Sequence, residues 1–181
     1  SPSKVDALFQ ELRRRAEFVV GLRSGVSTDE ITLTVDLEEE KAKIQECTNS
    51  ENRKFIRIIA NANVLQGEDV RVRYEVYDSR LVYSKGENIA SRSWVPKGAD
   101  AESFLHDLLA EVNHQAVDEG IMPDPVSGKV GAMDATAFFD AVEELQKATK
   151  VMSVKVLAAE NIYTEGPVQI VFHITPLGAS S

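Results

Sequence analysis

Apolar residues recur at helical spacing at the start of the chain and then change to strand spacing. Over residues 4–22 they recur every three or four positions, which predicts an amphipathic helix. Over 31–35 apolar residues alternate with threonine, which predicts a short half-buried strand. Asp36 then has the position of a helix N-cap, and Glu39 completes a capping box before a helix that ends near Cys47. The pattern predicts the order helix, strand, helix.

Strand spacing dominates the middle of the chain. Residues 54–63 are strongly apolar, and over 70–76 apolar residues alternate with charged ones. One face of that second strand is therefore expected to be buried while the other faces water. Further strands are predicted over 81–83 and 89–95, separated by turn-forming residues. This part of the chain predicts a meander of antiparallel strands.

The remainder of the chain returns to helices followed by a hairpin. One helix is predicted over 101–119, and another begins at an N-cap, Asp134, and continues through Leu145. Strands are predicted over 151–162 and 167–175. The order of elements is therefore similar in the two halves.

The two halves are also similar in sequence. Residues 56–76 align without a gap on residues 154–174, at an offset of 98. The apolar stripe of the helix over 4–22 falls on that of the helix over 101–119 at an offset of 96. The matched positions include Asp36 with Asp134, Ile58 with Val156, Ala60 with Ala158, Asn63 with Asn161, Val70 with Val168, Tyr74 with Phe172 and Val76 with Ile174. Apolar character is kept wherever a core requires it, which indicates an internal duplication.

The expected fold is a mixed α+β (α/β) fold made of two helix–strand–helix–hairpin units around a mixed or antiparallel sheet. We assign the first repeat to residues 1–98, including one inserted strand pair, and the second to 99–176. Residues 177–181 are expected to be a flexible tail, and the two repeats to form one compact domain, because a single hairpin is only marginally stable. From residue 54 the order of elements also resembles a ribonuclease-H-like arrangement, which is the alternative fold.

Composition narrows the class of protein. The 181 residues carry a formal net charge of −9, which argues against nucleic acid as a partner. Cys47 is the only cysteine, so an internal disulfide is excluded. The chain begins Ser-Pro-Ser and has no apolar run of the roughly 20 residues that cross a bilayer. We expect a fragment of a longer protein, with any membrane attachment outside it.

Three segments carry a family resemblance: residues 63–70, 80–90 and 159–168. They resemble the uncharacterised domain at the C-terminal end of long bacterial coiled-coil, myosin-tail-like proteins, best known from cyanobacteria. The block from Tyr163 to Pro167 is the most specific match, and the resemblance covers about residues 54–176. The resemblance implies a soluble, cytoplasm-facing globular end of a membrane-anchored coiled-coil protein. It implies no activity and no cofactor.

Catalytic and metal-binding patterns are weak. A ribonuclease-H-like nuclease needs carboxylates around two divalent ions, one of them on its central strand, where this chain has Asn61 and Asn63. His106 and His114 are two helical turns apart, which is unsuited to one metal site, and no phosphate loop or nucleophile elbow is present. We therefore expect no catalytic residues, no metal and no cofactor, and lean away from an enzyme.

The candidate interaction or loop residues are those of the repeated turn and its surroundings: Asn63, Asn161, Tyr163, Thr164 and Gly166. Asparagine before a turn adopts a left-handed backbone or bonds its own main chain, so a turn-forming role is the first interpretation and a symmetric ligand groove the second. The expected function is a binding or assembly module that associates with itself, as a homodimer, or with a protein partner. The alternative is a divalent-metal-dependent nuclease using Glu102 or Asp124, and a small-molecule sensor is a further one.

Overall fold

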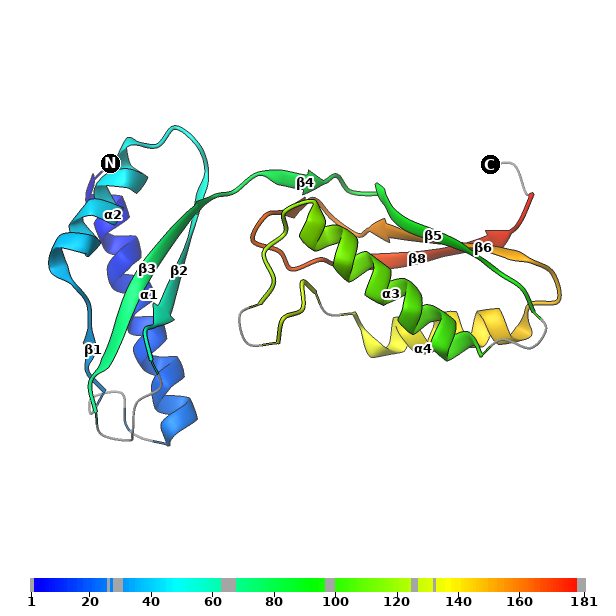
Figure 1. Ribbon diagram of the computed structural model, residues 1–181, viewed down its shortest axis with the longest axis horizontal. Helices are drawn as coiled ribbons and strands as arrows, with labels where there is room; N and C mark the ends of the chain where they lie inside the picture. Colours follow the sequence, from blue (N-terminus) through cyan, green and yellow to red (C-terminus); the bar gives the residue numbers. More distant parts are fainter. Residues whose placement is uncertain are drawn as a thin grey trace. The chain divides into compact units, whose positions relative to one another are not determined.

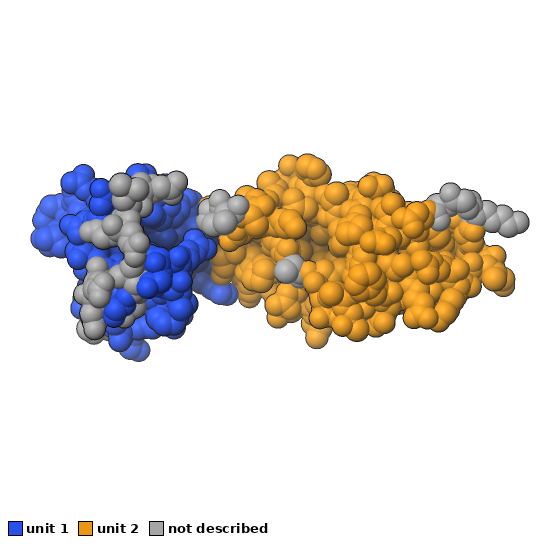
Figure 2. Space-filling view, turned by 90° about the horizontal axis from the view of Figure 1, so that it is seen from below, with its two compact units in different colours: residues 1–79 blue, residues 80–181 orange. Residues whose placement is uncertain are grey.

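The computed structural model describes residues 2–25, 27, 31–62, 68–96, 100–124, 127–131 and 133–178. Described helices and strands make a mixed α+β fold with four helices and small sheets, as the sequence predicts. The chain forms two compact units, residues 1–79 and residues 80–181, which are coloured separately in Figure 2. Each unit is described by itself below.

The first unit, unit 1, packs two helices on one face of a three-stranded sheet (Figure 1). Its elements are α1 (Pro2–Ser24), β1 (Leu33–Thr34), α2 (Leu37–Asn49), β2 (Lys54–Ala60) and β3 (Val70–Asp78). The strand order is β1-β3-β2, with β1 parallel and β2 antiparallel to β3. The sheet therefore has β3 in its centre and β2 at one edge.

The core of unit 1 is small. The rings of Phe9 and Tyr74 are both 1% exposed and lie 4.7 Å apart, which joins α1 to β3. Leu33 packs with Val70 and Val72 in a second cluster. No residue of α2 is fully buried. Among the described residues, fewer apolar side chains are therefore buried in unit 1 than in unit 2.

The second unit, unit 2, combines a helical hairpin with a three-stranded antiparallel sheet of order β5-β6-β8 (Figure 1). A short antiparallel pair, β4 with β7, completes it. Its elements are β4 (Leu81–Tyr83), β5 (Asn88–Trp94), α3 (Ala101–Asp118), α4 (Ala135–Lys147), β6 (Met152–Ala158), β7 (Ile162–Tyr163) and β8 (Ile170–Pro176). One large apolar cluster joins both helices to the sheet, and in it the Trp94 ring N–H donates to the carbonyl of Leu145 at 3.1 Å.

The helices α2 and α4 are the same element in two copies. Each has 13 residues and begins after an aspartate N-cap, Asp36 or Asp134, at the offset of 98. The cap carboxylates accept hydrogen bonds from backbone N–H groups of the first turn, which have no partner inside the helix. This confirms the caps that the sequence predicts.

The hairpins β2–β3 and β6–β8 share one register. Ile58 lies opposite Tyr74 in the first, and Val156 opposite Phe172 in the second, so both strands keep the offset of 98. The backbone bonds that flank the ladders also correspond: Asn61 to Arg71 with Ala159 to Gln169, Ser79 to Arg53 with Leu177 to Val151, and Val70 to Thr32 with Val168 to Val130. The internal duplication predicted from the sequence is therefore present in the backbone.

The inserted strand pair belongs to the second copy. The repeat predicts that residues 80–98 complete the first copy and that one domain forms. In the structure β5 pairs with β6 and β4 with β7, so this segment lies in unit 2 and the chain has two compact units. The pairing is long-range, and local periodicity does not specify it.

Two further expectations change. The predicted strand 31–35 is formed only over Leu33–Thr34. The ribonuclease-H-like alternative requires one sheet from residue 54 onward, whereas β2 and β3 belong to one unit and β5, β6 and β8 to the other. Of the predicted tail, residues 179–181 lie outside the described residues.

Candidate functional site: the open sheet of unit 1

The predicted site residues of the second turn lie together, and their polar groups bind the chain itself. Thr164 is buried, its backbone N–H donates to the Arg80 carbonyl at 3.0 Å, and its Oγ1 accepts from the Arg80 N–H at 3.0 Å. Asn161 Oδ1 accepts from the Lys85 N–H at 2.9 Å. Each contact ties the turn to the segment that leads into β5.

The remaining members of that set shape the same turn. Tyr163 lies opposite Leu81 in the β4–β7 pair. Gly166 has a φ of +64° and its N–H donates to the Tyr163 carbonyl at 2.8 Å. Asn63 lies outside the described residues. The geometry thus gives these residues contacts that hold a turn, while their use by a partner stays a prediction.

Of the residues considered for metal chemistry, Glu102 and His106 lie one helical turn apart, with Glu102 Oε1 3.8 Å from His106 Nε2. Within the described ranges, no group of three or more His, Cys, Asp or Glu side chains could hold a metal ion. Glu111 bonds Arg92 at 2.8 Å, and Asp124 Oδ1 accepts from the Ser127 N–H at 2.7 Å. His106 lies against the ring of Phe138 at 4.8 Å.

A groove of about 580 Å³ lies beside α3 in unit 2. Gly131 on its wall stands at the position of Leu33 in unit 1, and a Cβ there would come within 2.2 Å of the Val168 carbonyl oxygen. Leu33 is part of the unit 1 core. Main-chain atoms of Val168 therefore lie where a side chain at position 131 would begin, so only glycine fits there. Its lining is mainly apolar, with His106, His114, Asn113 and Lys129 as polar members.

The edge of β2 is open in unit 1. Antiparallel strands direct alternate main-chain groups toward opposite neighbours. The backbone groups of Arg53 and Asn61, which flank β2, bond to the β3 side. The residues between them whose N–H and C=O groups point away from β3 are therefore Lys54, Ile56, Ile58 and Ala60. No described strand pairs with them.

The same edge is occupied in unit 2. The twin of β2 is β6, which is a central strand because β5 pairs along its whole length. Ala158, the twin of Ala60, donates its N–H to the Glu87 carbonyl at 2.9 Å and accepts from the Gly86 N–H at 2.8 Å. The duplicated backbone thus shows which hydrogen bonds the β2 edge offers.

Side-chain burial also differs between β2 and its twin, β6. Val154 and Val156 are 0% exposed and Ala158 is 1% exposed. Their twins Ile56 and Ile58 are only half-buried, and Ala60 is exposed. Larger apolar side chains are therefore less well covered in unit 1, on a strand whose sequence is that of a central strand.

Two of the usual protections of an edge strand, a bulge and a proline, are absent from β2. Seven consecutive pairs join β2 to β3 without a register shift, so the strand has no bulge, and it contains no proline. By contrast, β8 ends at Pro176 and the β5–β6 ladder has a shift between Asn88 and Ala90. Lys54 is the one lysine in β2, and its Nζ is paired with Asp78 at 2.7 Å.

The outer face of the unit 1 sheet, away from the helices, carries aromatic and arginine side chains. Phe55 stacks on Tyr77 at 5.2 Å between ring centroids, and the Arg57 guanidinium lies 5.5 Å from the Phe55 ring centroid. The hydrogen bond from Tyr77, together with Arg73, holds the pKa of the Glu75 carboxyl below its ordinary value. Tyrosine and arginine are the residue types enriched at binding hot spots.

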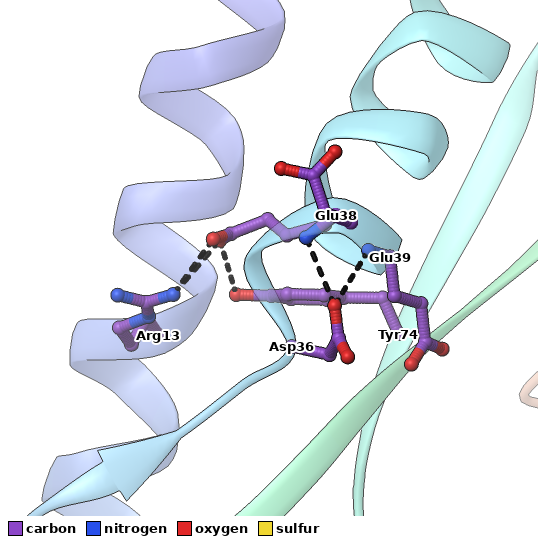
Figure 3. Close-up of polar contacts among 6 residues, drawn as sticks. Arg13, Asp36, Glu38, Glu39 and Tyr74 are labelled. Carbon is purple, nitrogen blue, oxygen red and sulfur yellow. Dashed lines mark hydrogen bonds and ion pairs between the residues drawn. The ribbon is translucent and has the colours of Figure 1, made fainter.

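A polar cluster fastens the helices to this sheet (Figure 3). Arg13 from α1 bonds both carboxylate oxygens of Glu40 at 2.9 Å, and the Tyr74 hydroxyl of β3 donates to Glu40 at 3.2 Å. Burial raises the pKa of the Tyr74 hydroxyl. The cluster joins α1, α2 and β3.

Helix α1 has a second, exposed stripe in which apolar residues lie on either side of a charged pair. Leu8, Phe18 and Leu22 are exposed, and with Glu11 and Arg15 they have the alternating spacing of three and four residues that is typical of coiled-coil seams. Glu11 and Arg15 form an ion pair at 2.9 Å within the stripe. In the described part of the chain no helix is long and apolar enough to cross a membrane.

Comparison with known families decides where unit 2 belongs. The model of the DUF3084-associated C-terminal helical hairpin family matches residues 83–177, just over half of the chain. The chain belongs to this family. The matched range contains α3 and α4, the helical hairpin, together with β5 to β8. No curated protein and no solved structure matches the chain.

The DUF3084-associated family is uncharacterised, so membership identifies architecture and no reaction. The match confirms that the sequence resemblance pointed to an uncharacterised C-terminal domain family. It begins inside β4 and leaves unit 1 outside the matched range. The open sheet thus belongs to the copy that the family model does not cover.

Proposed function

We propose that the chain is a protein-binding or assembly module and that unit 1 binds another polypeptide as an added strand on β2. One observation carries the proposal: no described strand pairs with the outer edge of β2, whereas its twin, β6, is a central strand in the same register. A strand added at an exposed sheet edge gains main-chain hydrogen bonds, and its alternate side chains supply specificity.

The added strand would complete the core of unit 1. It would run antiparallel to β2, as β5 does to β6, and would bond the outward groups of Ile56 and Ile58. It would also reduce the exposure of these two side chains, whose twins are fully buried. Apolar burial and main-chain bonding therefore favour the same partner geometry.

The outer face supports recognition of a protein. Phe55, Tyr77 and Arg57 lie on the face that a partner reaching β2 would also touch. The net charge of −9 favours a protein partner over nucleic acid. We place the module at the globular, cytoplasm-facing end of a longer, membrane-anchored bacterial coiled-coil protein, and the exposed stripe of α1 supports the coiled-coil element of this proposal.

Substituting Ile58→Pro tests the binding mode. Proline removes the outward N–H and its ring obstructs an added strand, but edge strands tolerate it at positions that do not bond their own sheet. Selection of a displayed library of nine-residue peptides against the intact chain should yield binders, and Ile58→Pro should weaken them by roughly tenfold or more.

The matched control is Ile58→Val, which has as many side-chain carbons as proline and keeps the N–H. It should retain most of the binding that Ile58→Pro loses. A second control, Ser91→Pro, alters the outward edge of β5 in unit 2 and should have no effect. Equal binding of the selected peptides by wild type and Ile58→Pro would contradict strand addition on β2.

A further inference from the structure

We infer that the strand added to β2 is β2 of a second copy of this chain, paired antiparallel about a twofold axis that passes through Ile56. This inference rests on the proposed function and names its partner. The reasons are the symmetry of such a pair, the residues that it sets opposite each other, and the regularity of the strand.

Symmetry limits the registers. In a continuous antiparallel sheet, a twofold axis perpendicular to the sheet keeps each residue on the same face in both copies. The axis must therefore lie midway between one residue of β2 and the same residue of the second copy, and it is named below as an axis through that residue. An isologous contact of this kind uses the same surface twice. The positions inside Lys54–Ala60 give five centres: Phe55, Ile56, Arg57, Ile58 and Ile59.

Charge excludes two of the five centres, and a third, Ile59, pairs only residues 58–60 of the strand. An axis through Arg57 sets this residue opposite itself, and an axis through Phe55 sets Arg57 opposite Arg53 of the second copy. Like charges directly opposite each other on a sheet are destabilising. An axis through Ile58 avoids this, but it sets Phe55 opposite Asn61, which already bonds Arg73 at 3.0 Å.

An axis through Ile56 gives complementary pairs. On the outer face, Phe55 of each copy lies opposite Arg57 of the other, so two cation–π pairs form across the interface. The same two residue types already lie 5.5 Å apart within one chain. On the inner face Ile56 meets its own copy, and Ile58 meets the aliphatic part of Lys54.

The backbone has the matching pattern. The residues whose N–H and C=O groups point outward include Lys54, Ile56 and Ile58, and this register sets Ile56 opposite Ile56 and Lys54 opposite Ile58. Outward groups therefore face outward groups along the pair, as hydrogen bonding requires. Because β2 has no bulge and no proline, the ladder is uninterrupted.

A cysteine scan tests both partner and register. In a Cys47→Ser background, Ile56→Cys, Arg57→Cys and Ile58→Cys each place one thiol on β2, and mild oxidation of the intact chain is followed by non-reducing mass analysis. Residues opposite each other in a bonded antiparallel pair have Cα atoms roughly 5.5 Å apart, which a disulfide can span. Ile56→Cys should therefore give several times more linked dimer than Arg57→Cys or Ile58→Cys.

A second arm keeps the test decisive if Ile56→Cys folds poorly. Mixing the outer-face variants Phe55→Cys and Arg57→Cys should give mainly the mixed dimer, because these positions oppose each other across the axis. Dimer yields that are equal at all positions, or highest for Ile58→Cys, would overturn the register. A monomeric mass by light scattering over a tenfold concentration range would overturn self-pairing, while peptide binding sensitive to Ile58→Pro would leave the proposed function standing.

Discussion

At the scale of residues, equivalent positions of the two copies carry polar side chains in unit 1 and apolar side chains in unit 2. Arg13, Glu40 and Tyr74 form the polar cluster of unit 1. At the same offsets of 96 and 98, unit 2 has only apolar residues, Leu109, Phe138 and Phe172. A partly buried ion pair costs desolvation that a well-packed apolar set does not. The comparison within one chain therefore predicts which changes unit 1 tolerates.

Breaking the cluster should cost more than replacing it. Glu40→Ala leaves the guanidinium of Arg13 and the hydroxyl of Tyr74 without their shared acceptor, and should lower the free energy of unfolding of unit 1 by about 1–2 kcal/mol. The triple replacement Arg13→Leu, Glu40→Phe and Tyr74→Phe should be neutral or stabilising. Urea unfolding followed by far-UV circular dichroism measures both.

Trp94 supplies the control for this experiment. It is the only tryptophan and lies in the core of unit 2, so its fluorescence reports that unit. The fluorescence transition should stay in place in the Glu40→Ala variant while the dichroism transition moves. If both transitions move together, the cluster does not act locally in unit 1.

At the scale of elements, α1 has two apolar stripes with different roles. Phe9 is buried on the inner stripe, whereas Phe18 and Leu22 are exposed on the outer one. The sequence pattern over residues 4–22 predicts one amphipathic helix and does not separate the two stripes: Leu8 and Val19 fit the helical spacing of its apolar residues and are exposed. The two stripes are distinguished only by the structure, which shows which side of α1 packs on the sheet.

Substitution should distinguish the stripes. Phe9→Ala leaves a cavity beside Tyr74 and should destabilise unit 1 by about 3–5 kcal/mol. Phe18→Ser changes an exposed side chain of the same type and should alter the free energy of unfolding by no more than about 0.5 kcal/mol. Thermal unfolding of the two variants measures the difference. Equal destabilisation would show that the outer stripe is packed inside the unit.

Local chemistry predicted several elements well. The Asp36 and Asp134 caps and the alternation along β3 depend on neighbours in sequence, and the offset of 98 carried the hairpin register from one copy to the other. The partner of β5 was not predicted, because a strand pattern shows that a strand exists and not which strand lies beside it. The open edge was missed for the same reason: the apolar run of β2 is typical of a covered strand.

At the scale of the whole molecule, duplication explains why one unit is a candidate binding surface. Both units contain two helices and a hairpin in the same register, but β5 completes the sheet of unit 2 alone. The predicted turn residues Asn161 and Thr164 support that arrangement through their bonds to Lys85 and Arg80. The candidate site lies instead where the described residues of the first copy include no counterpart of β5.

Amide hydrogen exchange of β2, resolved by residue and measured over a range of protein concentrations, tests this claim most directly. In dilute monomer the outward amides of Ile56 and Ile58 should exchange rapidly, while the inward amides of Arg57 and Ile59 and those of the twins Val154 and Val156 stay protected. The outward amides should gain protection as concentration rises or a strand peptide binds. Protection of Ile56 and Ile58 equal to that of Val154 and Val156 at the lowest concentration would contradict an open β2 edge.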